Sequence, residues 1–583
     1  MRNAPLYSRE QLGQLAIRSA TLDERMSGLY EPVSGMRNDT DLAVQRLASW
    51  CQSVANGDWR LFAKRLQRDG WTIESVMPRL AAIQLTPGEA LPAWLNDAEW
   101  IVPMMLVDVD PASLNELIGP TAAAQPFDAL FHGLIAESER RRDAMLTHRA
   151  LSRVQRSVRQ AMAYQLLVSL TKLCALAIFE SFVKFKNDKQ KQSTELVSNA
   201  SHPEELYHYV RFLDEMRQSG LCQLFETTPV LLRLLSSLIR QWIDSTAEFI
   251  QRLDADIDAV RLVFFDETAP CLVSKVETGL SDLHKFGRSV YIVHFTDNRK
   301  AVYKPKDLSI DKAWFDLVSW LNGQNTPVNL RAGRVVVRDG YGWAEFIAHS
   351  DCDDCESAKR FFERAGALLC LFYLLNGTDM HEENMIAAGS YPVPIDMEML
   401  LQAINTSEAA GAPAMLALEA AQKLLTDSVL MTGLLPGFVR SPGTAMMAQG
   451  GLLDIKFGVL PEIIWSEINT DAMVPSKGPF VQIHNSNLPK LDGVAVQVAD
   501  YVDSLLDGCE RYFHFLHHVK SKLVTDIGPL TAFASVPVRR ILKPTRFYAL
   551  LLERLRNHQK MHDGAIWSAH LDFVSRLADW DRG

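Results

Sequence analysis

The chain lacks the segments that would carry a protein out of the cytoplasm or through a membrane. Its first residues, MRNAPLYSREQ, contain no apolar run of the kind that a secretion signal needs, so a cytoplasmic protein is expected. The longest apolar stretch, Ala161 to Phe179, is interrupted near its middle by Gln165 and Lys172, where a spanning helix would least tolerate a charge. This stretch is therefore predicted to be a buried helix, and no membrane insertion is expected.

Cysteine is also scarce, with 8 residues in 583. Without a secretion signal these residues are expected to be reduced thiols rather than a disulfide framework. The CxxC pattern occurs once, at Cys352 and Cys355, and no second pair lies nearby to complete the four ligands of a structural zinc site, so we predict no zinc. A net charge of −10 argues against nucleic acid as a general partner.

Two nucleotide-binding signatures are missing as well. The chain contains neither GxGxxG nor a Walker A pattern, which excludes a typical protein kinase and a P-loop enzyme. The position of a glycine loop is taken instead by residues 279–290, with the sequence GLSDLHKFGRSV.

What the chain does contain is an acidic run, Asn376 to Leu401, with the spacing of a phosphoryl-transfer centre. Asn384 follows Asp379 by 5 positions, and Asp396 follows Asn384 by 12. A centre of this kind uses one Asp to accept the proton of the attacking hydroxyl, and an Asn and a second Asp to hold magnesium. An ordinary surface loop would explain the same residue types, so the interpretation depends on the surrounding elements.

The end of this run carries a second pattern. Acidic and apolar residues alternate from Pro394 to Glu398, which predicts an extended chain with Asp396 and Glu398 on one face and Ile395 and Met397 toward the core. Two carboxylates and an amide oxygen are suitable ligands for Mg²⁺.

The order of the predicted elements is that of a bilobal kinase, in the α+β class. Residues 1–260 are predicted to be a large, mostly helical N-terminal region, residues 261–350 a small sheet lobe, and residues 351–583 a helical lobe with the catalytic loops. Hairpins at 291–304 and 334–347, the second with an Asp-Gly turn, flank a helix at 311–321. A buried helix at 357–375, capped by Gly377, is predicted to deliver the acidic run.

Within the sheet lobe, Lys304 takes the place of the lysine that holds the phosphates of ATP in kinases. It lies at the end of the second strand of the first predicted hairpin. Its acidic partner is not evident from the sequence, and Asp316 is only a weak candidate.

Taken together, these residues resemble the dehydratase domain of type 2 lanthipeptide synthetases, the LanM family. The matching motifs are DLHKFGRSV at 282–290, VYKPK at 302–306, YGWAEF at 341–346, GTDMHEEN at 377–384, PVPIDME at 392–398 and RRILKPT at 539–545. Six ordered motifs over about half of the chain make a specific signal. Gln125-Pro126-Phe127 in the helical region is consistent with the same family.

The resemblance implies a lipid-kinase-like fold and two chemical steps that depend on ATP and Mg²⁺. A Ser or Thr of a precursor peptide with a leader would be phosphorylated, and phosphate would then be eliminated to give dehydroalanine or dehydrobutyrine. The implied catalytic residues are Asp379 and His381 for phosphorylation and Asp282, His284, Arg539 and Thr545 for elimination. Lys304 and Arg288 would bind the nucleotide, and Asn384, Asp396 and Glu398 would bind the metal.

The sequence departs from the family in several places. Ser281 replaces a usual Gly, and Lys306 and Lys543 replace usual Arg residues, which keeps the charge but loses bidentate geometry. The chain ends at Gly583 without the ligands of the zinc cyclase domain, so ring closure is not predicted. Two interpretations stay open: a stand-alone dehydratase with a separate cyclase as partner, or a piece of a longer synthetase. A kinase that stops at the phosphopeptide and a non-catalytic peptide-binding scaffold are the alternatives.

Overall fold

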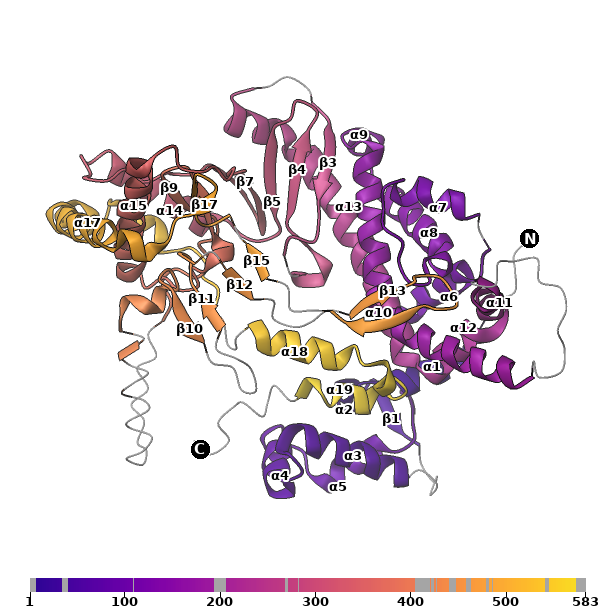
Figure 1. Ribbon diagram of the computed structural model, residues 1–583. Coiled ribbons are helices and arrows are strands. Elements are labelled where there is room, and N and C mark those ends of the chain that lie inside the picture. Colours follow the sequence, from indigo (N-terminus) through magenta and orange to yellow (C-terminus); the bar gives the residue numbers. More distant parts are fainter. Residues whose placement is uncertain are drawn as a thin grey trace.

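The computed structural model combines helices with several sheets, the largest of which has five strands. In Figure 1 this sheet lies between a group of helices from the first half of the chain and a group from the second half. The predicted α+β class is confirmed, whereas the lipid-kinase-like arrangement of two lobes and the three domain boundaries stay predictions. The described residues are 7–33, 40–108, 110–192, 206–267, 271–281, 283–403, 420, 424–425, 427–439, 447–453, 455–457, 463–478, 482–484, 486–540 and 545–572.

The N-terminal part forms a small group of helices with one antiparallel ribbon, in which β1 (Tyr30–Pro32) pairs with β2 (Ile83–Leu85). Thr21 and Glu24 form a capping box, in which each side chain accepts a hydrogen bond from the backbone N–H of the other residue. The helices are α1 (Arg9–Ser19), α2 (Leu22–Met26), α3 (Thr40–Ala55), α4 (Trp59–Arg68) and α5 (Ile73–Leu80).

The next helices pack around two long ones, α10 (Arg156–Gln192) and α13 (Pro229–Phe265). The stretch 161–179 lies within α10, and its residues Leu166, Leu167 and Leu170 are fully buried, as predicted. The others are α6 (Ala93–Met105), α7 (Pro111–Ile118), α8 (His132–Asp143), α9 (His148–Ser152), α11 (Tyr207–Glu215) and α12 (Leu221–Thr227), with a 3₁₀ turn at Asp128–Leu130 and a π-helical turn at Met216–Gly220.

Among the helices that the structure describes, α10 is the one whose length and apolar composition would allow it to cross a membrane. Half of its most apolar window is buried against other parts of the protein. The core helix of a soluble protein meets the same two criteria, so these criteria do not assign α10 to a membrane.

The five-stranded sheet is antiparallel throughout, in the order β3-β4-β5-β7-β6. Both predicted hairpins are confirmed, as is the helix between them, α14 (Ser309–Asn322). One face of the sheet packs on α13, where the ring of Phe249 contacts Tyr291 and Tyr303 with centroids 4.5 and 5.0 Å apart. The strands are β3 (Val273–Glu277), β4 (Tyr291–Phe295), β5 (Lys300–Lys304), β6 (Val335–Arg338) and β7 (Tyr341–Glu345).

Beyond the sheet, α15 (Cys355–Leu374) packs closely along α17 (Val502–Leu523). A Cβ on Gly366 would lie 2.0 Å from the backbone oxygen of Leu505, and one on Gly508 would lie 2.0 Å from that of Glu363, so both positions require glycine. The chain between these two helices contains short antiparallel strand pairs. They are formed by β8 (Met385–Ala388) with β9 (Tyr391–Pro394), β10 (Gly437–Val439) with β11 (Met447–Gln449), β12 (Ile455–Phe457) with β15 (Gln482–His484), β13 (Ile463–Ser466) with β14 (Val474–Lys477), and β16 (Lys490–Leu491) with β17 (Val494–Ala495).

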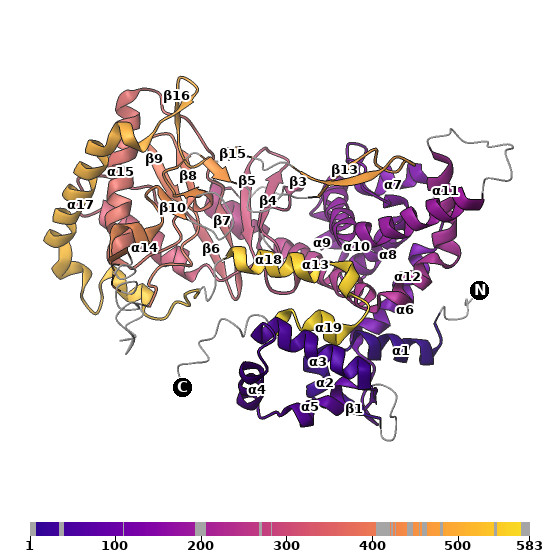
Figure 2. The same cartoon turned by 60° about the horizontal axis from the view of Figure 1, so that its bottom comes forward.

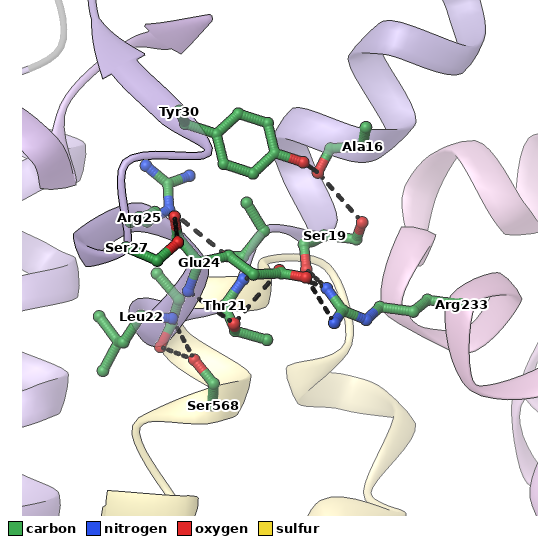
Figure 3. A network of polar contacts seen from close by, with 12 residues as sticks. Ala16, Ser19, Thr21, Leu22, Glu24, Arg25, Ser27, Tyr30, Arg233 and Ser568 are labelled. Atoms are coloured by element: carbon green, nitrogen blue, oxygen red, sulfur yellow. Dashed lines mark hydrogen bonds and ion pairs between the residues drawn. The ribbon is translucent and has the colours of Figure 1, made fainter. Parts of the chain in front are cut away.

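The last described helices, α18 (Thr545–Leu555) and α19 (Gly564–Ser568), return to the N-terminal helices (Figure 2). The hydroxyl of Ser568 accepts a hydrogen bond from the backbone N–H of Leu22 at 2.8 Å, and Arg233 of α13 pairs with Glu24 at 2.6 Å (Figure 3). A Cβ on Gly564 would lie 2.2 Å from the backbone of Ser19. The first and the last helices that the structure describes are thus packed together.

A buried ion pair joins the same two segments. Arg46 of α3 donates two hydrogen bonds to Asp563 Oδ2, at 3.0 and 2.7 Å, and Asp563 Oδ1 accepts from the backbone N–H of Ile566. The side chains of the pair are only 5 and 7% exposed. Because removing one partner leaves the other charge buried and unpaired, we expect Asp563→Asn to lower the free energy of unfolding by about 3 kcal/mol, measured by urea denaturation.

The pH dependence of this stabilisation follows from the pKa of Asp563. Burial raises the pKa, but the hydrogen bonds and charge of Arg46 outweigh that effect and lower it below the value of an unfolded chain. The stabilisation should therefore be complete above the unfolded pKa of about 4 and be lost as the pH falls through the folded value. In Asp563→Asn this part of the acid dependence should disappear, and an unchanged acid profile would contradict the assignment.

Candidate active site

The acidic run begins where α15 ends. The predicted cap is one residue out, because Asn376, with a φ of 49°, takes the left-handed position and Gly377 follows it. The N–H of Gly377 donates to the carbonyl of Phe372 at 2.7 Å and that of Asn376 to Tyr373 at 3.2 Å, which is a Schellman motif. Asparagine is the usual substitute for glycine in this conformation, and the motif turns the chain out of the buried helix.

The hairpin β8–β9 then brings the two halves of the run together. Met385 pairs with Pro394, and the N–H of Ile395 donates to the carbonyl of Asn384 at 3.0 Å. Asn384 and Asp396, 12 positions apart in the sequence, therefore flank the open end of one short ribbon. A hairpin of this length explains the spacing from which the site was predicted.

Residues 394–398 are not extended as predicted, because β9 ends at Pro394 and a turn begins at Glu398. The N–H of Glu398 donates to Asp396 Oδ1 at 3.2 Å, an Asx-type contact that bends the chain. Met397 is fully buried as predicted, whereas Ile395 is half-buried. The bend still turns the carboxylates of Asp396 and Glu398 to the same side.

Both carboxylates meet the ammonium group of Lys306. Its Nζ lies 2.5 Å from Asp396 Oδ2 and 3.0 Å from Glu398 Oε2. Burial raises the pKa of the Asp396 carboxyl, but the charges of Lys304 and Lys306 outweigh burial and lower it. Lys306 was not predicted as a site residue, although its position two residues after Lys304, on the same face of an extended chain, was a usable signal.

Lys304 reaches the same loop. It is 7% exposed, and its Nζ donates to the backbone oxygen of Ile395, the residue before Asp396. The end of β5 and the acidic run, 91 residues apart, are thereby joined by two lysines. The positive charge expected near the acidic run is supplied by both lysines rather than by Lys304 alone.

The acidic residue beside these lysines is Asp311, not Asp316. Asp316 is exposed and pairs with Lys312 one turn away on α14, at 2.6 Å. Asp311 is 2% exposed, and its Oδ2 has no hydrogen-bond partner among the described residues. Burial raises the pKa of Asp311 to about 6, with Lys304 opposing and Asp396 adding to the shift. Its place on the apolar stripe of the helix, three residues before Trp314, was the signal that sequence analysis missed.

Asp379 and His381 lie on the loop between α15 and β8. Asp379 has a φ of 68°, a left-handed conformation that is uncommon for a residue with a side chain. Burial raises the pKa of its carboxyl, and the charges of Asp396 and Glu398 raise it further while His381 opposes them. His381 Nε2 lies 3.5 Å from Asp379 Oδ1. A carboxylate whose pKa is raised in this way is suited to accept a proton.

Two of the residues assigned to elimination join the same group of charges. The Arg539 guanidinium pairs with Glu398 Oε1 at 2.5 Å, and the backbone N–H of Arg539 donates to the carbonyl of Glu398 at 3.0 Å. Burial lowers the pKa of His284, and the charge of Lys306 lowers it further. Glu398 therefore contacts both Lys306, which follows strand β5, and Arg539.

Of three further predicted residues, one lies away from the catalytic loops, one lies outside the described residues, and one has its side chain outside them. Arg288 donates to Glu248 of α13 at 2.6 and 3.1 Å, and none of its contacts in the described part of the chain is with loops 379–398. It lines a cavity of about 760 Å³ with Asp97, Asp244 and Phe286. Asp282 falls outside the described residues. Thr545 is the first residue of α18, with its side chain outside them.

The donor atoms present fit a magnesium ion. The Lys306 ammonium shows that Asp396 and Glu398 can face one cation. Asn384 Nδ2 donates to the backbone oxygen of Asp379 at 2.8 Å, which leaves its amide oxygen for a ligand role. Within the described ranges, no three His, Cys, Asp or Glu side chains form a metal site by themselves. Mg²⁺ completes its shell with water and substrate phosphates, so two carboxylates and an amide oxygen suffice.

Asp311→Asn tests the role of the buried acid. The substitution removes the charge beside Lys304 but keeps the shape, so we expect ATP-dependent turnover to fall about tenfold, or about 1.4 kcal/mol. The melting temperature should stay equal or rise, because an unpaired buried carboxyl is lost. Asp316→Asn, which removes the exposed pair, is the matched control and should change neither quantity. Equal activity of both variants would remove Asp311 from the site.

Comparison with known proteins gives two matches. Residues 229–582 match the family described as "Domain of unknown function (DUF4135)". The chain is also 24% identical over 405 residues to a protein of Lactococcus lactis subsp. lactis named "Lacticin 481/lactococcin biosynthesis protein LcnDR2". That match covers 65% of this chain and 41% of the relative, so the chain corresponds to about two fifths of the relative's length. Every predicted site residue lies within the family match.

Proposed function

The chain belongs to the DUF4135 family and to the LanM lanthipeptide synthetases whose motifs it carries, and on that premise we propose that it dehydrates Ser and Thr residues of a precursor peptide at the expense of ATP. The relative that it matches is named for the biosynthesis of lacticin 481 and lactococcin. We propose accordingly that the substrate of this chain is a ribosomal peptide with a leader and that the reaction takes place in the cytoplasm.

The observation that carries the proposal is the cluster of charges around Glu398. Glu398 forms ion pairs with Lys306 and with Arg539. The charges of Asp396 and Glu398 also act on Asp379, whose pKa they raise. Residues assigned to phosphoryl transfer and residues assigned to phosphate removal thereby share one site. A single site is what a reaction needs when the product of its first step is the substrate of its second.

In the first step a side-chain hydroxyl of the peptide would attack the γ-phosphorus of ATP, the bond from that phosphorus to the β,γ-bridging oxygen would break, and ADP would leave. Asn384, Asp396 and Glu398 would hold Mg²⁺, which would neutralise the charge of the phosphates. Asp379 is suited to accept the hydroxyl proton, because its pKa is raised toward the range of a general base. Lys304 and Lys306 would hold phosphate oxygens by charge. The arrangement of these loops and the sheet supports a lipid-kinase-like division into two lobes.

In the second step the peptide would lose the phosphate and an α-proton, and a carbon–carbon double bond would form. His284 is suited to act as the base, since its lowered pKa keeps the imidazole neutral and able to accept the proton near pH 7. Arg539 is suited to bind the departing phosphate by charge-assisted hydrogen bonds. Asp282 and Thr545 belong to this step by the family resemblance.

The proposal is tested by incubating the protein with ATP, Mg²⁺ and a candidate precursor peptide and reading the product mass. Loss of one water per modified residue is the expected result. Gain of a phosphate without loss of water would identify a kinase that stops at the phosphopeptide. An unchanged peptide that nonetheless binds would identify a scaffold, and omission of ATP is the control.

A further inference from the structure

Parts of the chain that follow the acidic run pack against the loop that carries Asp379. Thr432 accepts a hydrogen bond from Met380 N at 2.9 Å, and Asn487 Nδ2 donates to Gly451 O at 2.9 Å. A Cβ on Gly451 would lie 2.3 Å from Met380 O, so only glycine can pack against the loop at this position. Residues 432–434, 450–453 and 486–487 thus form the support on which the Asp379 loop rests.

Between Leu453 and Ser486 the chain makes an excursion of about thirty residues, which we call the arm. Its described parts are the pair β12–β15 and the hairpin β13–β14. In both views β13 lies across the long helix α10 of the N-terminal region, far from the loops where the arm begins (Figures 1 and 2). The arm therefore connects the support of the catalytic loop with a different part of the molecule.

The tip of the arm is held by Asn469, which has a φ of 64° and uses all of its amide hydrogen-bonding capacity. Its Oδ1 accepts from Phe127 N and from the Tyr209 hydroxyl, both at 2.8 Å. Its Nδ2 donates to Gln125 O at 3.1 Å and to Asp128 Oδ1 at 3.0 Å. The family motif Gln125-Pro126-Phe127, for which sequence analysis gave no role, forms half of this receptor.

A second tip residue, Asp471, caps a helix of the N-terminal region. Its carboxylate accepts from His208 N at 3.0 Å and Tyr209 N at 2.6 Å, which are the free N–H groups at the start of α11. A negative charge is favourable there because it meets both the unpaired donors and the helix dipole. Lys186 donates to the backbone oxygen of the same residue at 2.5 Å.

Apolar contacts complete the attachment, but only on one side of the hairpin. Met473 is 3% exposed, and Trp465 packs edge-on against Phe179 of α10 with ring centroids 5.5 Å apart. On the opposite face of the hairpin, Ile464 and Val474 are about half exposed. The side chains at the tip therefore make specific contacts with the N-terminal helices, whereas those on the outer face of the strands are exposed.

We propose that Asn469 and Asp471 are positioning residues, through which the N-terminal helical region holds the support of the catalytic loop in its active arrangement. A loop of about thirty residues that is fixed only at its ends samples many conformations. Fixing its midpoint as well divides it into two shorter loops, each with fewer conformations. The ends of the arm are then constrained at Leu453 and Ser486. Asn487 Nδ2 donates to Leu453 O and to Gly451 O, and Gly451 lies against Met380 of the Asp379 loop. Ser486 O accepts from Ala387 N of β8, the strand that follows this loop. The catalytic part of the inference rests on the proposed dehydratase function; the mechanical part does not.

The test compares Asn469→Ala with Val474→Thr, an exposed β-branched substitution on the same hairpin. Hydrogen–deuterium exchange is measured on the full chain in the absence of peptide. Asn469→Ala is expected to raise exchange by at least tenfold at the tip and also at residues 432–434, 450–453 and 486–488, while α17 stays protected. Val474→Thr is expected to match the wild type throughout.

Turnover supplies the second readout. Asn469→Ala should lower the kcat of phosphorylation about tenfold with an unchanged KM for ATP and an unchanged melting temperature, a combination that a general loss of stability would not give. Asp471→Asn, which keeps one acceptor oxygen, should lie between Asn469→Ala and the wild type.

Faster exchange at the tip alone, with kcat unchanged, would overturn the proposal. Exchange needs no catalysis, so if the wild type shows no ATP-dependent reaction the proposed function fails while the exchange pattern still decides whether the arm acts on the loop.

Discussion

Asp396→Asn and Asp379→Ala are each expected to abolish phosphopeptide and dehydrated peptide together. Asp396 supplies a carboxylate to the cation site, and without it the charge of the phosphates is not neutralised. Asp379 supplies the base and alignment for the attacking hydroxyl. Since elimination can begin only from a phosphorylated residue, both steps stop at the same point, and turnover should fall at least about a thousandfold, or about 4 kcal/mol.

The structure adds a condition to this result. Asp396 is paired with Lys306, so the neutral amide of Asp396→Asn leaves a partly buried ammonium without one of its two counterions. We expect some loss of stability, which thermal melting will measure. The melting temperature of Lys306→Met, which removes the other side of the pair, gives a second measure of the stability that the pair contributes. If Asp396→Asn lost activity only in proportion to its loss of folded protein, the metal role would be wrong.

Feeding each variant a synthetic phosphopeptide separates the steps further. Asp379→Ala should still eliminate phosphate from it, because the residues assigned to elimination are intact. Failure of this variant on the phosphopeptide would mean that Asp379 acts in both steps.

Arg539→Ala is expected to leave phosphorylation largely intact and to slow elimination about a hundredfold, so that phosphopeptide accumulates. An oriented charged donor to a developing anion is commonly worth about 3 kcal/mol. The measurement is the ratio of phosphorylated to dehydrated peptide over time by mass spectrometry. Arg539→Lys should recover only part of the rate, because lysine keeps the charge but cannot form two parallel hydrogen bonds.

The competing explanation is that Arg539 serves only to hold the fold through its carboxylate partner. The partner exists, since Arg539 pairs with Glu398 at 2.5 Å, but the arginine side chain is 54% exposed. Exposed pairs contribute about 0–1 kcal/mol, too little for their loss to unfold the chain. An unchanged melting temperature with accumulated phosphopeptide supports the dehydratase. Parallel loss of both steps would instead show that Arg539 acts by holding Glu398 in the cation site.

Much of the fold could be predicted because the signals were local. The hairpins at 291–304 and 334–347 and the helices at 311–321 and 357–375 follow from periodicity and turn residues within each segment. The cap at Asn376 was missed by one residue because asparagine and glycine both adopt the left-handed conformation, and the sequence does not say which of two neighbours takes it.

The site was harder to predict because its contacts are not local. Lys306 and Asp396 are 90 residues apart, and the periodicity within either segment does not show that these two side chains meet. Asp311 was hidden for the opposite reason, since a lone acid on an apolar helix stripe looks like an error in the pattern until its neighbours are known. The role of Asn469 could not be read from the chain at all, because its four hydrogen-bond partners come from other elements.

The return of α19 to the N-terminal helices sets the order in which this protein can fold during synthesis. Ala565 and Ala569 belong to the same apolar cluster as Trp50 and Phe62, and Trp50 Nε1 donates to Asp572 at 2.6 Å. Helices α3 and α4 therefore lack part of their core until residues 565–572 have been translated. At about 5–20 residues per second that interval is of the order of half a minute or longer, during which α3 and α4 expose apolar surface to the cell.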